Sequence, residues 1–445
     1  MQSFRQRLDD ALTRLHAVKS LVVAFSGGLD SCVLLHALKQ HYPDQEICAV
    51  HVNHQLQTDA VDWQNHCQTV CDKLSVMLYQ EVVNVNAVAG ESLEARAREL
   101  RYQVFAAHIN EDDCLLTAHH QDDQAETLLL QLLRGAGPHG LAAMPIVARF
   151  GNGHHARPLL NVTRDEIHAY AQQNGLQWIE DHSNADTAFD RNYLRHEIMP
   201  CLKQRWPAAA ATLSRSSQLC ADAAHLLDAR ARQWLENTGV DSRKRLPVPA
   251  LQQLDDSDCR NVLRYWLHQS GWPLPTYAHL QAIVHEVIQA REDAAPLLKW
   301  DGVEVRRFDD ELYVMHALSS HDNSRVYPLQ ASHCQGQQSL ALPGIGELTA
   351  QVVTAGGVDL ERLRQARLQV RFRQGGERCR QIGHLHSQSL KKLMQQWRIP
   401  PWQRGRIPLI YNDDELVCVV GHCICEGYQA GGDAPGVLFR LEPSS

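Results

Sequence analysis

The regular alternation of short apolar runs with amphipathic stretches over the first two hundred residues limits the fold of this chain more than any other feature. Runs of strand length lie at 21–25, 46–52, 75–83 and 114–119. Stretches long enough for crossover helices lie between them at 29–40, 60–74 and 93–110, and a strand-like run at 156–160 precedes a helical stretch at 164–174. Such alternation favours a parallel sheet with helices on both faces. Residues 1–206 are therefore expected to form one α/β domain.

The remainder of the chain has a different texture. A chain of 445 residues is expected to contain more than one domain, because single cores tend to stop growing near about 250 residues. Residues 207–318 are rich in Ala and Leu and predict a mainly helical domain, with a hairpin at 303–315 whose turn is Asp309 and Asp310. The polar segment 319–339 predicts a linker, and residues 340–445 predict a small α+β domain.

The composition is that of a folded protein without a membrane anchor. Hydrophobic residues make up 44% of the chain and charged residues 21%, close to the average for globular proteins. The N-terminal segment MQSFRQRLDDALTRL is charged throughout, and no run approaches the roughly 18 apolar residues of a membrane span. Thirteen cysteines without a regular framework are expected to be reduced thiols. These features predict a cytoplasmic protein.

The motif SGGLDS lies between the first apolar run and the first helical stretch. It comprises Ser26, Gly27, Gly28, Leu29, Asp30 and Ser31. Glycines let backbone N–H groups converge on phosphate oxygens, and a helix N-terminus favours an anion. The loop lacks the Lys of a Walker A motif, which follows a transferring γ-phosphate. We therefore expect it to hold a pyrophosphate leaving group, with Asp30 as a Mg²⁺ ligand. A turn built of small residues is the simpler alternative.

Two further polar clusters offer chemistry. In AHHQDDQAETLLLQLLRGAG, Asp123 and Glu126 share one face of a predicted helix near its N-terminus. This pair could bind Mg²⁺ or a cationic amine, or simply favour a first helical turn. In EDHSNADTAFDRNYLRHEIMP, Arg191 and Arg195 could clamp a phosphate, or form ion pairs with Asp186 or Glu197. Because ligands bind at the carboxyl ends of parallel strands, SGGLDS and the carboxylate pair should meet at one site.

The net charge of −8 conceals a basic segment near the C-terminus. Residues 361–411 contain twelve Lys or Arg and only two acidic residues, interleaved with Phe372, Trp397 and Trp402. Phosphate contacts combined with aromatic anchors suit a docking surface for an RNA backbone. A solvated surface rich in arginine is the alternative.

Taken in order, these motifs resemble one family. SGGLDS, HVNHQL (51–56), AHHQDDQAET, RGAG (134–137) and EDHSNADTAFDRN occur in the order found in the tRNA(Ile)-lysidine synthetases, which are N-type ATP pyrophosphatases. The C-terminal sequence RFRQGGER…KKLMQQWRIPPWQRGRIPLIY is similar to that family's last domain. The resemblance is dense over residues 20–200, and it implies a parallel-sheet N-terminal domain of the adenine nucleotide alpha hydrolase-like fold.

The resemblance also implies an activity. ATP would adenylate the wobble cytidine of the CAU anticodon of tRNA(Ile), and the side-chain amine of free L-lysine would then displace AMP to give lysidine. The six SGGLDS residues would hold pyrophosphate and Mg²⁺, and Arg134 and Gly135 would border the nucleotide. Asp123 and Glu126 would hold lysine, with Arg191 and Arg195 facing tRNA or phosphate. A homodimer is a possible assembly, and the sequence does not determine the oligomeric state.

Other classes remain open at this point. A tRNA thiolase on the same fold would need a persulfide-carrying Cys or a Cys-bound cluster, and the chain has no C-x-x-C; Cys67 and Cys71 are four apart, and Cys423 and Cys425 alternate. An ammonia-using synthetase shares SGGLDS but normally needs a glutaminase. A non-catalytic RNA-binding module would leave SGGLDS and the carboxylate pair unexplained. The histidines, among them His119, His120, His154 and His155, lack the Cys or carboxylate complement of a zinc site.

Overall fold

The computed structural model describes residues 4–14, 18–53, 60–84, 93–180, 186–239, 245–291, 294–432 and 434–443. The chain divides into two compact units, Met1–Leu227 and Asp228–Ser445, and each is described by itself. Within HVNHQL the last three residues, and within EDHSNADTAFDRN residues 181–185, lie outside the described residues.

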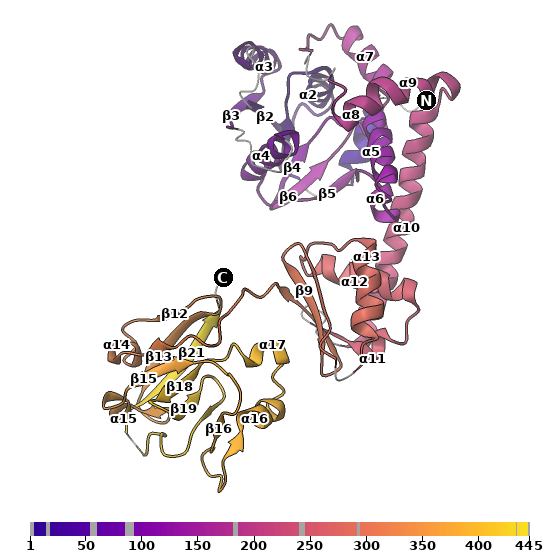
Figure 1. Ribbon diagram of the computed structural model, residues 1–445. Coiled ribbons are helices and arrows are strands. Elements are labelled where there is room, and N and C mark those ends of the chain that lie inside the picture. Colours follow the sequence, from indigo (N-terminus) through magenta and orange to yellow (C-terminus); the bar gives the residue numbers. More distant parts are fainter. Residues whose placement is uncertain are drawn as a thin grey trace. The chain divides into compact units, whose positions relative to one another are not determined.

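The first unit is built on a six-stranded sheet with the order β3-β2-β1-β4-β6-β5 (Figure 1). Its strands are β1 Ser20–Ala24, β2 Glu46–Asn53, β3 Met77–Val82, β4 Asp113–Leu116, β5 Val147–Phe150 and β6 Gly153–Ala156. All neighbours are parallel except β5, which is antiparallel to β6. The predicted parallel sheet is confirmed. The strand expected at 156–160 was wrong, because β6 ends at Ala156 and the apolar Leu159 and Leu160 that follow are buried in a turn.

Helices cover both faces of this sheet. On one face of the sheet, Val23 and Leu116 are buried in a core to which four helices contribute. On the other face, Val22 and Leu115 pack against Phe105 of a fifth helix. Successive residues of a strand point to opposite faces, so each strand supplies both cores. The helices of the first face are α1 Phe4–Leu12, α2 Leu29–His41, α3 Ala60–Leu74 and α7 Arg164–Gln173, and that of the second is α4 Leu93–Ala107.

A further group of helices follows the sheet at its carboxyl edge. α5 Gln121–Leu133 begins soon after β4, and its Ala125 packs against Met199 and Ala210. Leu132 and Leu133, near the end of α5, are 57% and 77% exposed. The other elements are α6 Pro138–Leu141, α8 Asp190–Tyr193, the π-helix η2 Leu194–Ile198, α9 Met199–Arg205 and the long α10 Ala209–Thr238. Figure 1 shows α10 as one continuous helix.

The second unit begins with a four-stranded antiparallel sheet packed against helices. Its order is β7-β10-β9-β8, and the predicted hairpin is confirmed as β9–β10. Asp309 and Asp310 have φ of 52° and 58°, the two positive values of a type I′ hairpin turn. The elements are β7 Arg245–Pro247, α11 Val248–Leu251, α12 Asp256–Gln269, α13 Tyr277–Ala282, η3 Ile283–Ile288, β8 Leu297–Trp300, β9 Val303–Phe308 and β10 Glu311–His316.

The rest of this unit combines two larger sheets and a two-stranded ribbon with short helices, as the α+β prediction expected. One sheet is β11-β15-β18-β19-β20 (Tyr327–Pro328, Leu368–Arg371, Leu409–Asn412, Glu415–Val419 and Cys423–Ile424). The other is β12-β13-β21-β14 (Leu340–Leu342, Gly346–Val353, Gly436–Pro443 and Val358–Asp359). The ribbon pairs β16 Arg378–Cys379 with β17 Gln388–Ser389, and the helices are α14 Ala331–Cys334, α15 Leu360–Arg364, α16 Leu390–Gln396 and α17 Pro401–Arg404.

The segment 319–339 contains core residues as well as polar ones. Tyr327, Leu329 and Cys334 are buried with residues of the C-terminal sheets, so part of the segment that was expected to be a linker belongs to the C-terminal core. The domain boundaries at 206, 318 and 339 stay predictions. All thirteen cysteines have free thiols. Within the described residues, no helix combines the length and apolar character that a bilayer span requires.

Candidate functional site

SGGLDS and the start of α5 meet at the carboxyl edge of the sheet. β1 and β4 are adjacent parallel strands, so the segments that follow them emerge side by side. His120 joins the two motifs, since its Nε2 lies 3.8 Å from Oδ2 of Asp30 and 3.5 Å from Oδ2 of Asp123. The sequence therefore anticipated the convergence but not the buried histidine that mediates it.

The SGGLDS loop is shaped for a close approach of backbone to a ligand. Gly27 has φ of 79°, and a Cβ there would lie 2.8 Å from Sγ of Cys67, so only glycine fits. Oγ of Ser26 accepts from the N–H of Gly28 at 3.3 Å and lies 3.1 Å from Oγ of Ser31. α2 begins after Gly28 without a side-chain cap, which leaves its first N–H groups available to an anion.

Asp30 stands at the first turn of α2 as a half-buried carboxylate. Burial raises its pKa, Asp123 adds to the rise, and His120 opposes it. Its Oδ1 is buried without a hydrogen-bond partner among the described residues, an arrangement that a bound cation would satisfy. No described group of three or more His, Cys, Asp or Glu side chains could hold a metal ion. A cation here would therefore take its other oxygens from the bound ligand or from water.

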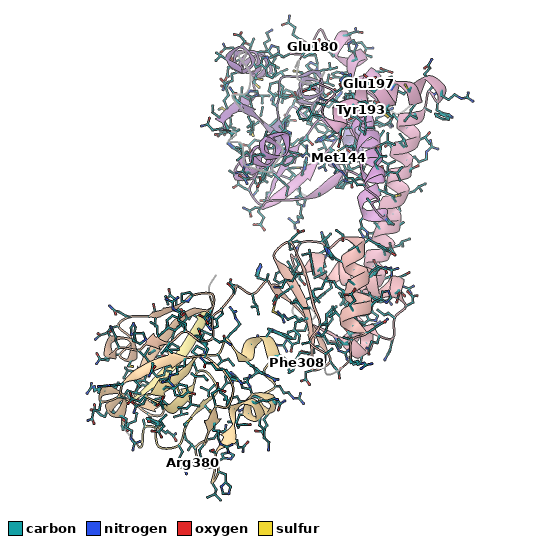
Figure 2. All side chains as sticks on the ribbon, in the orientation of Figure 1. Met144, Glu180, Tyr193, Glu197, Phe308 and Arg380 are labelled. Atoms are coloured by element: carbon teal, nitrogen blue, oxygen red, sulfur yellow. The ribbon has the colours of Figure 1, made fainter. Side chains whose placement is uncertain are left out.

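Asp123 and Glu126 on α5 are held by Arg191 and Arg195. Nε of Arg195 donates to Oε1 of Glu126 at 2.8 Å, and its Nη2 donates to Oδ1 of Asp123 at 2.8 Å. Nε of Arg191 donates to Oε2 of Glu126 at 3.1 Å, and its Nη2 donates to Oδ1 of Asp123 at 3.2 Å. We call these four residues the ion-pair network. It joins α5 to α8 and η2, the segment that carries Tyr193 and Glu197 in Figure 2.

Burial makes this network electrostatically strong. The side chain of Glu126 is 2% exposed and that of Asp123 is 11% exposed. Burial alone would raise the pKa of Asp123, but His120 and the two arginines hold it well below its usual value. Burial likewise opposes the charge of Arg195, and its hydrogen bond to Glu126 raises its pKa instead. The ion pairs considered from sequence, with Asp186 or Glu197, do not form among the described residues.

A small polar cavity of about 80 Å³ adjoins the network. Two residues that the sequence did not single out, Arg164 and Lys203, contribute cationic side chains to it, and Lys203 forms an ion pair with Asp122. Asp122 lies within the motif AHHQDDQAET, so the sequence gave a signal for this carboxylate. Nothing near Lys203 in the sequence marks Lys203 as a site residue. The full lining is His120, Asp122, Glu126, Arg164, Arg195, Met199, Pro200 and Lys203.

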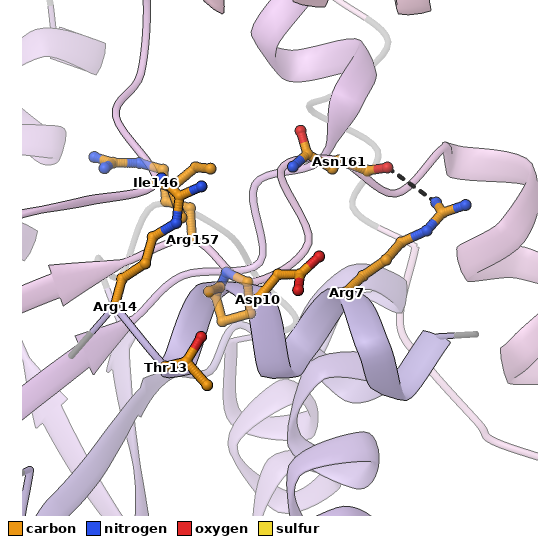
Figure 3. Close-up of a pocket in the computed structure, with 9 residues that line it drawn as sticks. Arg7, Asp10, Thr13, Arg14, Ile146, Arg157 and Asn161 are labelled. Atoms are coloured by element: carbon orange, nitrogen blue, oxygen red, sulfur yellow. Dashed lines mark hydrogen bonds between the residues drawn. The ribbon is translucent and has the colours of Figure 1, made fainter. Parts of the chain in front are cut away.

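A larger cavity of about 350 Å³ lies beside α1 (Figure 3). Arg7 borders it and donates from Nη1 to the carbonyl of Asn161 at 2.9 Å, the dashed contact in Figure 3. Its guanidinium also forms a two-pronged ion pair with Glu166. Arg157 lines the cavity as well, and its backbone N–H donates to the carbonyl of Ile146. These arginines are already engaged by protein groups.

The remaining residues of the motifs are less closely tied to this site. Arg134 and Gly135 end α5, at the opposite terminus from Asp123, a separation of about 16 Å from the rise of a helix. Their assignment to the nucleotide rests on the resemblance alone and stays a prediction. Leu29 is the first residue of α2 and packs partly against the core. Nδ1 of the buried His51 is bonded to the carbonyl of Phe25 at 2.9 Å, so this histidine is a satisfied structural residue.

The aromatic residues of the basic segment are packing residues. Phe372 is 2% exposed in the C-terminal core. Trp397 stacks on His422, and Trp402 packs against Tyr313 and Phe308, the latter labelled in Figure 2. Phe372 is therefore a core residue, whereas Trp397 and Trp402 are partly exposed and also pack against rings of the same unit. A role of the two tryptophans in RNA docking stays a prediction. The charged residues remain: Arg380, Lys391 and Lys392 are exposed, without ion pairs among the described residues.

Comparisons with known proteins identify the family of the chain. The family description "PP-loop domain" matches residues 1–202, "TilS substrate binding domain" matches 246–313, and "TilS substrate C-terminal domain" matches 368–442. Three similar curated proteins are each named tRNA(Ile)-lysidine synthase. The protein of Coxiella burnetii is 43% identical, and the match covers 98% of this chain and 96% of that protein. The protein of Serratia proteamaculans is 42% identical, with 94% of each chain covered. The protein of Legionella pneumophila (strain Lens) is 39% identical, and the match covers 93% of this chain and 94% of that protein. The chain therefore belongs to the tRNA(Ile)-lysidine synthase family.

Proposed function

We propose that this chain joins free L-lysine to the wobble cytidine of the CAU anticodon of tRNA(Ile), using ATP and releasing AMP and pyrophosphate. The observation that carries the proposal is the meeting of a phosphate-shaped glycine loop with buried carboxylates at one sheet edge. Relatives named tRNA(Ile)-lysidine synthase match nearly the whole chain, which supports this reaction. The cytoplasm is the expected compartment, and a homodimer stays a prediction about assembly.

The first step is adenylation of the base. The cytidine 2-carbonyl oxygen attacks the α-phosphate of ATP, and pyrophosphate leaves. The N–H groups of SGGLDS and the start of α2 are suited to hold the leaving group. Asp30 offers its unpartnered Oδ1 to Mg²⁺, an ion that neutralises phosphate charge when bound. Ser26 and Ser31 add hydroxyl groups to the same loop.

The second step transfers lysine. Its side-chain amine attacks C2 of the adenylated cytidine, and AMP leaves with the electron pair of the C–O bond. Asp123 is linked to Asp30 through His120, and Glu126 shares both arginines with Asp123. The two carboxylates would bind the ammonium and help remove its proton before attack. A carboxylate pair can do this only if it is free to face a new cation.

Arg191 and Arg195 limit that freedom. Two carboxylates and two guanidinium groups give the ion-pair network no net charge, so a lysine cation entering alone would leave one positive charge unbalanced in a buried site. We infer that a phosphate of the bound tRNA draws an arginine away and leaves carboxylate oxygens for the amine. Arginine suits both partners, since its planar fork pairs with carboxylate and phosphate alike.

The thiolase alternative is not favoured. The full-length relatives are lysidine synthases. A thiolase also needs a reactive thiolate near the nucleotide. Burial raises the pKa of Cys32, Cys67 and Cys71 to about 12, so these thiols near the loop stay protonated. Cys379, Cys423 and Cys425 lie in the other unit.

The deciding experiment is mass analysis of tRNA(Ile) transcript after incubation with the protein, ATP and lysine. A mass gain equal to lysine less water on one cytidine of the anticodon is expected, with no gain when ATP or lysine is omitted. A gain of one sulfur from a sulfur donor, or no change of mass, would reject the proposal.

A further inference from the structure

A buried hydrogen-bond chain runs from Arg157 to the carboxyl end of β4. Nη2 of Arg157 lies 3.2 Å from Nδ1 of His155, and Nε2 of His155 lies 2.8 Å from Oγ1 of Thr117. The same Oγ1 lies 2.7 Å from Nδ1 of His119. We call these four residues the histidine relay. Arg157 is 9% exposed, Thr117 6% and His155 3%, so its interior is closed to bulk water.

The chemistry of each member fixes the direction of every hydrogen bond. A guanidinium can only donate, so Nδ1 of His155 must accept. A neutral His155 then carries its proton on Nε2 and donates it to the hydroxyl of Thr117. The hydroxyl hydrogen has His119 Nδ1 as its acceptor. If His119 donated instead, this buried hydroxyl would accept twice and leave its own hydrogen unpaired, at a cost of roughly 1–3 kcal/mol.

These hydrogen-bond directions decide which ring nitrogen of His119 carries the proton at the edge of the candidate site. With Nδ1 accepting, neutral His119 carries its proton on Nε2, which forms no hydrogen bond among the described residues. His119 directly precedes His120, and the charges of Asp123 and Arg191 act on it. Burial first, and then Arg157, lower the pKa of both His119 and His155 to about 3. Both rings are therefore neutral near pH 7, in agreement with the hydrogen-bond directions.

We propose that Arg157, His155 and Thr117 are positioning residues that fix His119 as a neutral Nε2–H donor for an acceptor atom of the adenylated cytidine. The proposal rests on the lysidine-forming reaction proposed above. In this role His119 does not act as the base that deprotonates lysine. It orients the electrophile while the ion-pair network receives the amine. A fixed donor needs no reorganisation at the moment of reaction.

A competing explanation is that the relay only stabilises the sheet. Thr117 directly follows β4, and its hydrogen bond to His155 connects it to the neighbouring strand β6. These hydrogen bonds satisfy buried polar groups. That role would require hydrogen bonds but no particular tautomer at His119. The tautomer and the identity of the donating atom therefore separate the two explanations.

The first test is spectroscopic and does not depend on activity. The chain is labelled with ¹⁵N-histidine, and signals lost in His119→Gln and His155→Gln assign the two rings. Two-bond nitrogen–proton spectra are expected to show the Nε2–H tautomer for both, without titration between about pH 6 and 8. An Nδ1–H tautomer at His119, or an imidazolium there, would overturn the proposal. Thr117→Val should mix the tautomers of His119.

The second test is kinetic. Thr117→Val should slow single-turnover transfer of lysine by at least about ten-fold, the size of effect seen when a supporting hydrogen bond is removed, while ATP–pyrophosphate exchange changes by less than about two-fold. Thr117→Ser should restore the rate. His119→Gln places an amide N–H near the Nε2 position and should retain more activity than His119→Asn.

Ser20→Ala is the matched control, because it removes a part-buried hydroxyl, bonded to Asp113 at 2.7 Å, from the start of β1 in the same sheet. It should keep the wild-type transfer rate. Equal rates for Gln and Asn at position 119, or a Thr117→Val rate that follows only its loss of thermal stability, would make the relay structural. If wild type adds no lysine to tRNA, the proposed function fails, whereas the tautomer measurement still stands.

Discussion

Arg195 and Glu126 lie 69 residues apart in the chain, yet their side chains form a two-pronged pair, with Nε 2.8 Å from Oε1 and Nη2 2.9 Å from Oε2. The carboxylate is almost fully buried, with 2% of its side chain exposed. A buried carboxylate paired in this way is costly to replace. It is also unavailable to any other cation until the arginine moves. Both consequences can be measured.

Glu126→Gln should separate the two half-reactions. The amide keeps the shape of the side chain but removes one negative charge, so lysine capture and deprotonation should both fall, with a higher lysine KM and slower lysidine formation. Pyrophosphate exchange with ATP and tRNA should remain. Because Glu126 is buried, we also expect a loss of roughly 1–3 kcal/mol in the free energy of unfolding. Lysine KM, single-turnover product and exchange are measured together on the purified variant.

Glu166→Gln is the control for that experiment, since Glu166 also forms a two-pronged pair with an arginine, Arg7, in the same unit. It should lower stability without raising the lysine KM. If exchange collapses together with lysine incorporation in Glu126→Gln, Glu126 belongs to the adenylation site and its assignment to lysine is wrong.

Asp30→Asn should abolish pyrophosphate release while tRNA binding stays within about two-fold. The charge of Asp30 is assigned to Mg²⁺, and its unpartnered Oδ1 has no other role among the described residues. Asp113→Asn removes a buried carboxylate at the opposite edge of the same sheet and should retain release. The two variants are compared by pyrophosphate release and by tRNA filter binding. A parallel loss of both properties in Asp30→Asn would assign the carboxylate to RNA or to folding.

The sequence was informative wherever function depends on local chain geometry. Gly27 and Asp30 could be placed in the turn from β1 to α2 because a glycine loop between a strand and a helix has few conformations. Asp123 could be brought to the same edge by the rule for parallel strands. The type I′ turn at Asp309 and Asp310 is equally local.

What the sequence could not reveal depends on contacts between distant residues. For Arg191 and Arg195 the sequence offered a phosphate clamp or local ion pairs with Asp186 or Glu197, because local partners are the ones that spacing makes visible. The fold instead brings them to α5. Phe372 was expected at a surface because arginines flank it, but alternation along β15 and the following residue turns it into the core.

The exposed cations of the C-terminal segment give a prediction about RNA binding. Replacing Arg380, Lys391 and Lys392 together with Ala should weaken tRNA binding and flatten its salt dependence, with the slope falling by about one for each phosphate that is no longer neutralised. Arg362, Arg364 and Arg371 provide a triple variant with the same change of charge, but these side chains are already bonded to protein oxygens. Their replacement should change the slope less. Equal slopes in all three proteins would make the segment a solvated surface.

The ion-pair network also predicts an order of binding. Without tRNA, its carboxylates are neutralised by Arg191 and Arg195, so a lysine cation gains little there and loses its hydration. With tRNA bound, a phosphate that attracts one arginine would free a carboxylate pair for the amine. Lysine should therefore bind at least about ten-fold more tightly in the presence of tRNA(Ile), which corresponds to a coupling of about 1.4 kcal/mol.

Equilibrium dialysis of radiolabelled lysine measures this coupling, with tRNA(Ile), with a tRNA that lacks the CAU anticodon, and without RNA. Arg195→Gln should bind lysine more tightly than wild type when RNA is absent, because one competing cation has been removed from Glu126. The benefit of adding tRNA should shrink in that variant, since less charge remains to be drawn away. Lysine affinity that is the same with and without tRNA in wild type would show that the arginines do not guard the carboxylates. In that case the amine must bind elsewhere, and the cavity lined by Asp122 and Lys203 is the next place to test.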